Sequence, residues 1–389
     1  MFHSRRIAVM GGDVFRDEHS LAFDGTDDYI QVAETTYDID GGTVSFTFWA
    51  KLDDTSVQNL VMAKTSPNYA FINIHSNGSL YIESDTNDDA ASAPITHDTS
   101  WHHYVVSCNS GTVSMYQDGN ALAMGDSSVS DDITLSTISY SASKVFNGNI
   151  SEVAIYNIAL SSSQAKTIYN GREPFDHKNW AKTGNLTQWW RMGDGAYDGG
   201  YIVTDEANLG IVGEISPNPT FDSNITGWSA YGDDGSGNDN IVAHETTIKK
   251  TGAGSIKSTS KGSNAWAFKS GNLTWVANKV YLLTADVYIP DGNTATNLQP
   301  RLTDGAGLSG ASVEQYILPD ASLVDTWQKT STVFLNASDT GGDEIYGNLA
   351  NHGSNNDVIY WDNVHLMHLS GNAGVMLNMS FDDIEGDTP

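Results

Sequence analysis

Cysteine is nearly absent from this sequence of 389 residues, in which Cys108 is the single example. One cysteine cannot form an intrachain disulfide, so buried apolar side chains must supply the stability of the fold. Basic residues are also scarce: 19 lysines and arginines stand against 48 aspartates and glutamates, and the formal net charge is −29. A surface this negative repels phosphate backbones and anionic lipid leaflets, so we expect neither nucleic acid nor a membrane among the partners.

Long apolar runs are missing as well. No segment is long enough to span a bilayer, and only four apolar residues lead up to Gly11, too few for the core of a signal peptide. We therefore expect a chain that is made and folded in a cytoplasm. The motifs Cys-x-x-Cys, His-Glu-x-x-His and Gly-x-x-x-x-Gly-Lys do not occur in the sequence. Zinc chemistry and nucleotide hydrolysis consequently have no support.

The sequence does contain many short apolar runs separated by turn-forming residues. Hydrophobic residues make up 39% of the chain and glycine occurs 37 times, a composition that favours folded cores with frequent turns. Val44, Phe46 and Phe48 fall on one face of a predicted strand, while Ser45 and Thr47 fall on the other. The same alternation repeats along the chain and predicts strand after strand.

A single short helix is predicted after Leu160. Ser161–Ser163 offer capping side chains, Gln164–Asn170 form the helix, and Gly171 ends it. The length is generous for one sandwich and sufficient for two. The predicted fold class is therefore all-β, with two antiparallel β-sandwich (jelly-roll) domains and one short helix.

Five blocks in the first half of the chain resemble the laminin-G-like, concanavalin-A-like lectin/glucanase sandwich family, in its phage-type form. The blocks follow the order of the family within residues 20–171, and they are Ser20–Ile30, Val44–Ala50, Trp101–Val106, Met115–Gly119 and Phe146–Ser161. The resemblance implies a two-sheet antiparallel jelly-roll. It implies little about chemistry, because this fold hosts lectins, adhesion modules and glycanases.

The remainder of the chain is interpreted as an insertion followed by a return to the first sandwich. Gln188–Gly195 and Gly374–Ser380 resemble one continuous tail of phage proteins with such sandwiches, although a long stretch separates them here. That stretch resembles jelly-roll carbohydrate-binding modules of the xylan/glucan type, through the segments Asn218–Phe221, Gly227–Trp228, Val280–Tyr288, Thr326–Lys329 and Ile359–Leu366.

These resemblances divide the chain into three parts. We predict an N-terminal arm at residues 1–17, a first sandwich at residues 18–215 that residues 370–389 complete, and a second sandwich at residues 216–369. The arm has no clear hydrophobic period, so it is either a loose tail or a segment that docks on a partner.

No constellation in the sequence predicts catalysis. Glycanases of this fold place two carboxylates on one strand, whereas the next same-face positions after Glu152 hold alanine and tyrosine. His102 and His103 are adjacent and would point to opposite faces of a strand, so they cannot share a metal ion. Cys108 has no neighbouring base and is interpreted as a buried apolar residue. We therefore expect a protein that is not an enzyme and has no catalytic residues.

Acidic turns offer candidate ligands for calcium, which takes six to eight oxygens. In the binding-module family an aspartate near the last strand is a ligand, and Asp362 matches it. The candidate ligands are Asp24, Asp27 and Asp28 in the first sandwich and Asp233, Asp234, Asp239 and Asp362 in the second. Acidic loops that are merely solvated are the alternative. Structural calcium is the one cofactor that the sequence suggests.

Aromatic side chains in loops are candidates for carbohydrate binding, since their rings stack on the apolar faces of sugars while polar groups bind the hydroxyls. The candidates by loop context are Trp228, Tyr231, Trp266, Trp275 and Tyr316. Packing in the core of a sandwich is the alternative for each of them.

Three classes of function remain. The first is a structural or adhesion protein on the virion surface of a tailed phage, as a head decoration or a tail or fibre component, which explains an extracellular architecture without a leader. Its partners would be other capsid or tail proteins and host or environmental glycans, and the phage resemblance implies a homo-oligomer such as a trimer. The second is a secreted cellular protein for glycan binding or adhesion. The third is a glycanase.

Overall fold

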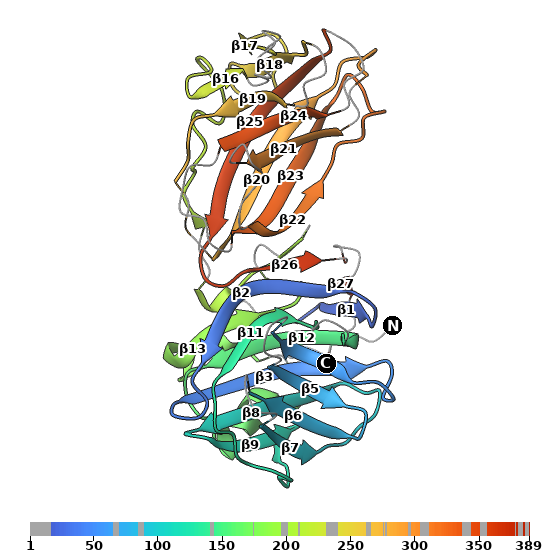
Figure 1. Cartoon of the computed structure of the whole chain (residues 1–389), viewed down its shortest axis with the longest axis vertical. Helices are drawn as coiled ribbons and strands as arrows, with labels where there is room; N and C mark the ends of the chain where they lie inside the picture. Colours follow the sequence, from blue (N-terminus) through green and yellow to red (C-terminus); the bar gives the residue numbers. More distant parts are fainter. Residues whose placement is uncertain are drawn as a thin grey trace, which may run out of the picture.

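Two β-sandwiches stacked along the long axis make up the molecule (Figure 1). The computed structural model describes the chain from Asp17 to Pro389, except for residues 65–69, 85–88, 141–143, 174, 196–200, 209–210, 231–239, 262–265, 275, 277, 295–296, 304–310, 337–343, 351–355, 378, 380–383 and 386–388. The arm predicted at residues 1–17 therefore lies outside the described residues, apart from Asp17. The described chain consists mainly of antiparallel strands with one short α-helix, so the predicted all-β class is confirmed.

The first sandwich is formed by two eight-stranded sheets. Sheet A has the order β10 (Asn120–Ala121), β9 (Thr112–Gln117), β8 (His102–Asn109), β3 (Thr43–Leu52), β12 (Asn147–Tyr156), β1 (Ser20–Asp24) and β27 (Ile384–Glu385), with β13 (Leu186–Trp190) beside β12. Sheet B has the order β14 (Ile202–Val203), β26 (Gly374–Leu377), β2 (Tyr29–Tyr37), β11 (Ile133–Ile138), β4 (Asn59–Ala63), β5 (Phe71–His75), β6 (Ser79–Glu83) and β7 (Ala90–Pro94). The core between them includes Phe46, Phe48 and Trp190, each at most 1% exposed.

The last strands of the sequence belong to this first sandwich. β26 lies between β2 and β14, with Met376 opposite Ile30, and β27 pairs with β1. Met376 is fully buried in the core that sheets A and B share. A strand from the far end of the chain is therefore part of sheet B.

Polar contacts fix the segment that leads into β26. The side-chain amide of Asn372 accepts a hydrogen bond from the backbone N–H of Ala33 at 2.8 Å and donates one to its carbonyl at 3.3 Å. The backbone N–H of Asn372 donates to Asp205 at 3.0 Å, and its carbonyl accepts from the indole of Trp190 at 2.7 Å. Asp205 also accepts from the backbone N–H of Trp189. Asn372 thus connects β2, β13 and the returning chain.

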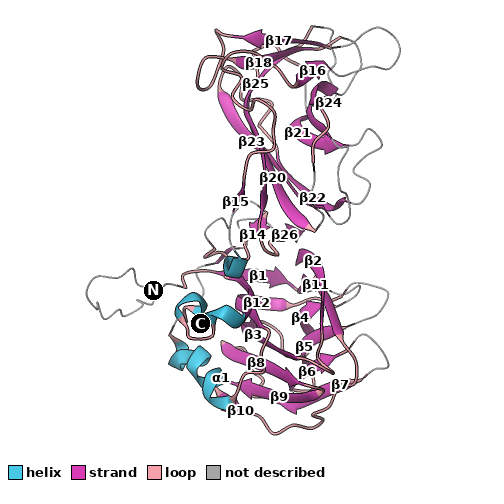
Figure 2. Cartoon of the chain, turned by 90° about the vertical axis from the view of Figure 1, so that its left-hand side faces the viewer, coloured by secondary structure: helices cyan, strands magenta, loops and turns pink. Residues whose placement is uncertain are grey.

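The chain between β12 and β13 covers the outer face of sheet A. α1 (Ser162–Tyr169) begins at a capping box formed by Ser161 and Gln164, and it ends at Asn170 in the left-handed conformation. Short 3-10 helices are η1 (Asn170–Arg172), η2 (His177–Asn179), η3 (Thr183–Asn185) and, after β14, η4 (Glu206–Asn208). Ile168 and Trp189 pack in this layer, whose helices lie along one side of the first sandwich (Figure 2).

The second sandwich has one large sheet and one small sheet. Sheet C has the order β17 (Ile241–Glu245), β18 (Ser255–Thr259), β25 (Val358–Leu369), β20 (Lys279–Tyr288), β23 (Trp327–Asn336) and β22 (Ala311–Ile317), with β15 (Ile211–Val212) beside β25. Sheet D has the order β16 (Trp228–Ala230), β19 (Trp266–Ser270), β24 (Glu344–Ala350) and β21 (Asn297–Thr303). Trp361 and the stacked rings of Tyr281 and Phe334 occupy the core. No helix among the described residues is long and apolar enough to cross a bilayer.

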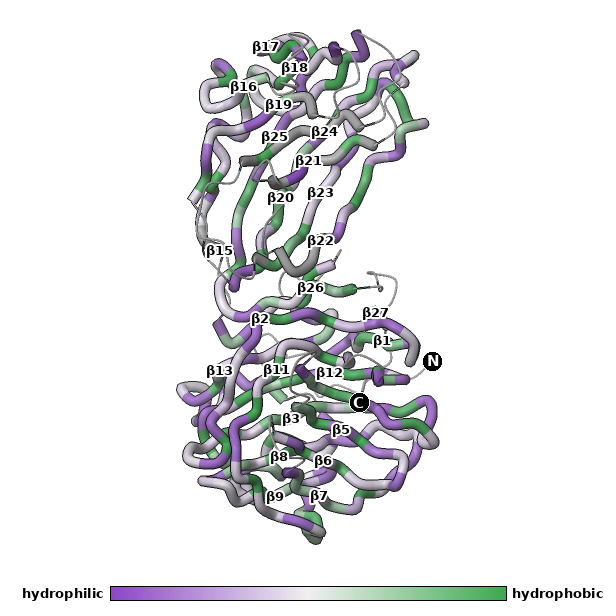
Figure 3. Tube along the Cα trace, viewed as in Figure 1, coloured by the Kyte–Doolittle hydropathy of each residue, from purple (hydrophilic) through white to green (hydrophobic). Residues whose placement is uncertain are grey.

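Apolar and polar residues alternate along many of these strands (Figure 3). A small apolar cluster lies where the two sandwiches meet, with Val280, Val333 and Leu335 from the second sandwich against Ile202 and Val375 from the first. Beside it is an open polar cleft of about 480 Å³, whose walls come from β2, β13 and the start of β20. The two sandwiches therefore contact each other through side chains as well as through the connecting chain.

Replacing Met376 by alanine is expected to destabilise the first sandwich by about 2–4 kcal/mol, because the change leaves a cavity in a closed core. Differential scanning calorimetry would measure it as a lower Tm for the transition of that sandwich. Trp361→Ala identifies the transition of the second sandwich, because the side chain of Trp361 lies in the core of that sandwich. Leu318→Ala is the matched control, because Leu318 is 49% exposed; equal losses for Met376→Ala and Leu318→Ala would contradict the proposed role of β26.

Candidate functional site

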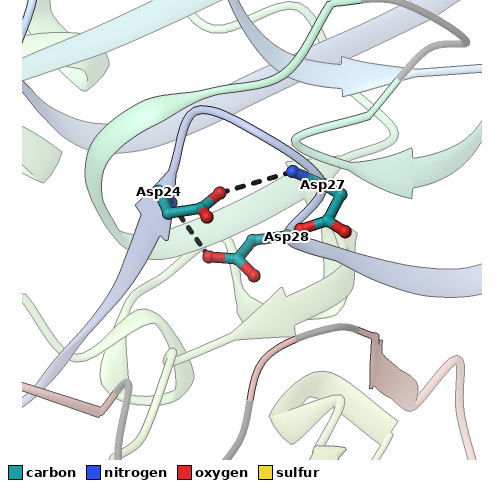
Figure 4. A group of neighbouring side chains, drawn as sticks. All are labelled: Asp24, Asp27 and Asp28. Atoms are coloured by element: carbon teal, nitrogen blue, oxygen red, sulfur yellow. Dashed lines mark hydrogen bonds between the residues drawn. The ribbon is translucent and has the colours of Figure 1, made fainter.

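The turn between β1 and β2 brings three predicted calcium ligands together (Figure 4). Asp24, Asp27 and Asp28 each offer a carboxylate oxygen, and these oxygens lie within 4.8 Å of one another. Asp24 accepts from the backbone N–H groups of Thr26 and Asp27, and Asp28 accepts from that of Asp24. Converging carboxylates of this kind fit the ligand preference of calcium, which needs more oxygens than these three side chains supply.

A second acidic group in the first sandwich was not identified from the sequence. Asp38 and Asp40, before β3, lie close to Asp132, which precedes β11. Burial and the neighbouring charges of Asp38 and Asp40 raise the pKa of Asp132. The spacing of Asp38 and Asp40 is visible in the sequence, but their approach to Asp132 depends on the fold.

Of the predicted acidic ligands in the second sandwich, Asp362 is the one that lies among the described residues. Asp233, Asp234 and Asp239 lie outside the described residues. Asp362 is 0% exposed on β25, and its two oxygens accept backbone N–H groups of Lys250, Thr251 and Asn363 at 2.7–3.0 Å. Burial, despite these hydrogen bonds, raises the pKa of Asp362.

One of the aromatic residues predicted as sugar platforms, Trp228, is buried. Trp228 is 6% exposed and packs edge-on against Phe221 and Phe268, with its indole donating to the carbonyl of Pro217. Trp228 is therefore a core residue at the start of β16, and burial of its large apolar ring stabilises the fold. The expectation that it lies exposed was wrong.

Among the other four candidates, Tyr316 is the one whose side chain is described. Tyr231 and Trp275 lie outside the described residues, as does the side chain of Trp266 on β19. Tyr316 is half-buried on β22, opposite Thr332. Tyr316 lies in sheet C and Trp228 in sheet D, so these two candidates are on different sheets.

A different set of aromatic side chains lies in a row across sheet C. Trp327 on β23 is opposite Tyr288 on β20, Tyr288 is opposite Tyr360 on β25, and Tyr360 is opposite Lys257 on β18. Ring centroids are 5.6 Å apart for Tyr288 and Trp327 and 5.9 Å apart for Tyr288 and Tyr360. The ammonium of Lys257 lies 6.0 Å from the centroid of Tyr360. We call these four residues the aromatic row.

The aromatic row is on the outer face of sheet C. Val287 and Trp361, the sequence neighbours of Tyr288 and Tyr360, point into the core, and successive side chains of a strand alternate between faces. Tyr288 and Trp327 are half-buried, and Tyr360 is 8% exposed. Because neighbouring strands are about 4.8 Å apart, the row of four strands extends over about 14 Å.

Polar groups border the aromatic row. The hydroxyl of Tyr288 donates to Asp325 at 3.2 Å, and the backbone N–H of Asp291 donates to the same oxygen at 3.1 Å. Asp325 has a φ of 53°, a left-handed conformation that is unfavourable for a residue with a side chain. Lys329 lies two residues after Trp327 and pairs with the buried carboxylate of Asp286 at 3.6 Å. Hydrogen-bonding groups and aromatic rings thus occur together on one face.

Sequence reasoning missed the aromatic row because its members are separated along the chain by 31 to 103 positions and lie inside strands, not in loops. The only available signal was the alternation within each strand, which places Tyr288 and Tyr360 opposite their core-facing neighbours. The register between strands, which brings them together, is a property of the tertiary structure.

The carboxylate of Glu152 does not face a cleft. It is 4% exposed and accepts hydrogen bonds from the indole of Trp189 at 2.6 Å and from the guanidinium of Arg191 at 3.2 Å. His102 and His103 have separate partners, since His102 bonds to Asp118 and His103 to Thr47. These side chains act within the packing of the first sandwich.

Several solved structures are similar in fold to parts of the chain. A Bacteroides ovatus protein, provisionally described as carbohydrate-binding, has 16% identity and a TM-score of 0.34 over 49% of this chain and 56% of its own. The CBM22-1 xylan-binding domain of Paenibacillus barcinonensis Xyn10C has 19% identity and a TM-score of 0.29, over 41% of this chain and 97% of its own. The CBM40 of the Ruminococcus gnavus IT-sialidase has 12% identity and a TM-score of 0.30, over 39% of this chain and 96% of its own.

The chain spans little more than half the length of the first of these structures. A search of curated proteins found no match. A family model does match the first sandwich: that of the Concanavalin A-like lectin/glucanases superfamily, over residues 24–166. The predicted resemblance of this part of the chain to the concanavalin A-like sandwiches is therefore confirmed, since residues 24–166 match the model of that superfamily.

Proposed function

We propose that the protein is a non-enzymatic glycan-binding protein, displayed on the virion surface of a tailed phage as a head decoration or as a tail or fibre component. The aromatic row of Trp327, Tyr288, Tyr360 and Lys257 is the observation that carries the glycan-binding part of the proposal. The concanavalin A-like match of residues 24–166 supports it, because lectins are among the proteins of that superfamily.

The chemistry of the aromatic row suits a sugar chain. Aromatic rings offer apolar surface to the C–H faces of pyranose rings, and they lose little conformational entropy on binding. Asp325, Lys257 and the tyrosine hydroxyls offer acceptors and donors for sugar hydroxyls at the borders of the same surface. A row across four strands is long enough to contact more than one sugar unit.

The virion part of the proposal rests on the sequence and on the return of the C-terminal strands. Gln188–Gly195 and Gly374–Ser380 resemble one phage-type tail, and the described parts of both segments lie in or beside the first sandwich. The partners would be other virion proteins, in a homo-oligomer such as a trimer. A secreted cellular adhesion protein is the alternative location for the same binding function.

Trp327→Ala and Tyr288→Ala are each expected to weaken glycan binding by about tenfold or more, which corresponds to about 1.4 kcal/mol. The measurement is a microbial glycan array followed by titration calorimetry on the best ligand. Tyr316→Ala is the matched control, since Tyr316 is an aromatic residue of the adjacent strand outside the row.

Unchanged affinity in both row variants would contradict the role of the aromatic row, and the absence of any glycan ligand would contradict the binding function. Release of reducing sugar from the bound glycan, in the same samples, would favour the glycanase alternative instead.

Calcium is proposed as a structural ion at the turn of Asp24, Asp27 and Asp28. Adding calcium after treatment with a chelator is expected to raise the Tm of the first sandwich, because an ion that binds the folded state stabilises it. Asp27→Asn is expected to reduce this increase, and Asp222→Asn, in the second sandwich, is the control. A Tm that does not respond to calcium in the unmodified protein would rule out the site.

Mass spectrometry of purified particles is expected to detect the protein as a stoichiometric component of the virion. Labelled-antibody microscopy would then locate it on the head or on the tail. Particles that lack the protein, together with its detection on a cell surface or in the medium, would favour the secreted adhesion protein.

A further inference from the structure

A group of charged side chains holds the described start of the chain against the first sandwich. Asp194, which follows β13, accepts hydrogen bonds from the backbone N–H groups of Glu18 and His19 at 2.5 and 2.8 Å. Its other oxygen contacts the imidazole of His19 at 2.8 Å. We call residues 17–19, which precede β1, the N-terminal segment. A single carboxylate therefore binds two consecutive backbone N–H groups and one side chain of this segment.

Two more carboxylates lie at the same place. Asp17 forms a side-chain hydrogen bond with Asp194 and interacts with the charge of Glu152. A hydrogen bond between two carboxyl groups requires a proton on one of them, and the raised pKa of Asp17 with the lowered pKa of Asp194 favours the proton on Asp17. The hydroxyl of Ser151, next to Glu152, donates to Asp17 at 3.4 Å.

Glu152 reaches this group because of a bulge in β12. The register of β12 against β3 shifts between Ser151 and Ala154, and Glu152 has a φ of 51°. Bulges redirect a side chain, and a left-handed residue other than glycine is strained, so both features mark a position that the rest of the fold maintains. The carboxylate is aimed into the interior, where Trp189 and Arg191 bind it.

Positive charge near these carboxylates is limited among the described residues. Arg191 bonds to Glu152 through Nε and to the carbonyl of Asp194 through Nη1, and His19 is the other basic group. In the adjoining layer, burial lowers the pKa of His177 to about 3 and raises the pKa of Tyr156, so both are neutral. Glu385 of β27 is in register with Ser20.

We propose that the proton shared by Asp17 and Asp194 is a pH-sensitive clamp, which holds the N-terminal segment on the first sandwich in acid and releases it as the pH rises. Loss of the proton to water would leave Asp17, Glu152 and Asp194 as three neighbouring anions. Their repulsion is relieved when Asp17 moves away from the other two, which are fixed to the sandwich by Arg191 and Trp189.

The direction of the pH dependence follows from the raised pKa of Asp17. Burial, the charge of Glu152 and the hydrogen bond to Asp194 raise the pKa of Asp17 well above 3.8. A carboxyl group with a raised pKa binds its proton more tightly in the docked state, so docking is strongest below the ordinary pKa of Asp17. Docking then weakens as the pH rises from about 4 through the raised pKa of Asp17.

Hydrogen exchange of residues 17–21 in the full chain, corrected for intrinsic rates, measures docking through the amides of Glu18 and His19. Protection at pH 5 is expected to exceed that at pH 8 by at least about tenfold, the change that one pKa unit allows. Asp17→Asn keeps a donor towards Asp194 but cannot ionise, so it should retain at pH 8 the protection that the unmodified protein shows at pH 5.

The imidazole of His19 also contacts Asp194, so its contribution needs a separate test. His19→Gln removes the imidazole but keeps a hydrogen-bonding side chain, and it should preserve the pH dependence if Asp17 is the switch. The clamp would be overturned by protection that does not change between pH 5 and pH 8. It would also be overturned if His19→Gln abolished the change while Asp17→Asn retained it.

Discussion

The first sandwich is closed by a strand from the other end of the chain, and the remaining features depend on that closure. Sheet B contains β26 between β2 and β14, so the core includes Met376 together with residues of the first third of the sequence. Burial of such apolar side chains is the largest favourable contribution to folding. Asn372 and Asp205 add the hydrogen bonds that the backbone of the return segment requires on leaving the second sandwich.

This arrangement places a complete second domain between two neighbouring strands of the first. The second sandwich begins and ends near the same edge of sheet B, where Val280, Val333 and Leu335 meet Ile202 and Val375. Two connections and an apolar contact restrict the second sandwich more than one linker would. Sheet C therefore keeps its outer face, with the aromatic row, at a defined position on the molecule (Figure 1).

Side chains alternate between the two faces of a strand, and this explains where the aromatic row and the acidic turn between β1 and β2 are found. One side of each sheet is used to fill a core, so functional groups have to come from the other side, from turns or from irregular positions. Tyr288 and Tyr360 use the outer side of sheet C, and Asp24, Asp27 and Asp28 use a turn. Glu152 uses a bulge, which turns a carboxylate from a central strand towards Arg191 and the start of the chain.

Sequence reasoning succeeded where the signal is local and failed where it is not. The faces of residues 43–50, the capping at Ser161 and the end of α1 near Gly171 follow from neighbouring residues, and the structure has them. Trp228 was misassigned because a tryptophan in a turn-rich segment looks the same whether its ring is exposed or packed against Phe221 and Phe268.

The sequence alone determined the all-β class, the concanavalin A-like character of the first sandwich and the acidic surface, because periodicity, motif order and charge are written in adjacent residues. The tertiary structure decided which strands pair, and with them the aromatic row and the meeting of Asp17, Glu152 and Asp194. Register and distant packing minimise the free energy of the whole chain, so no local segment specifies them.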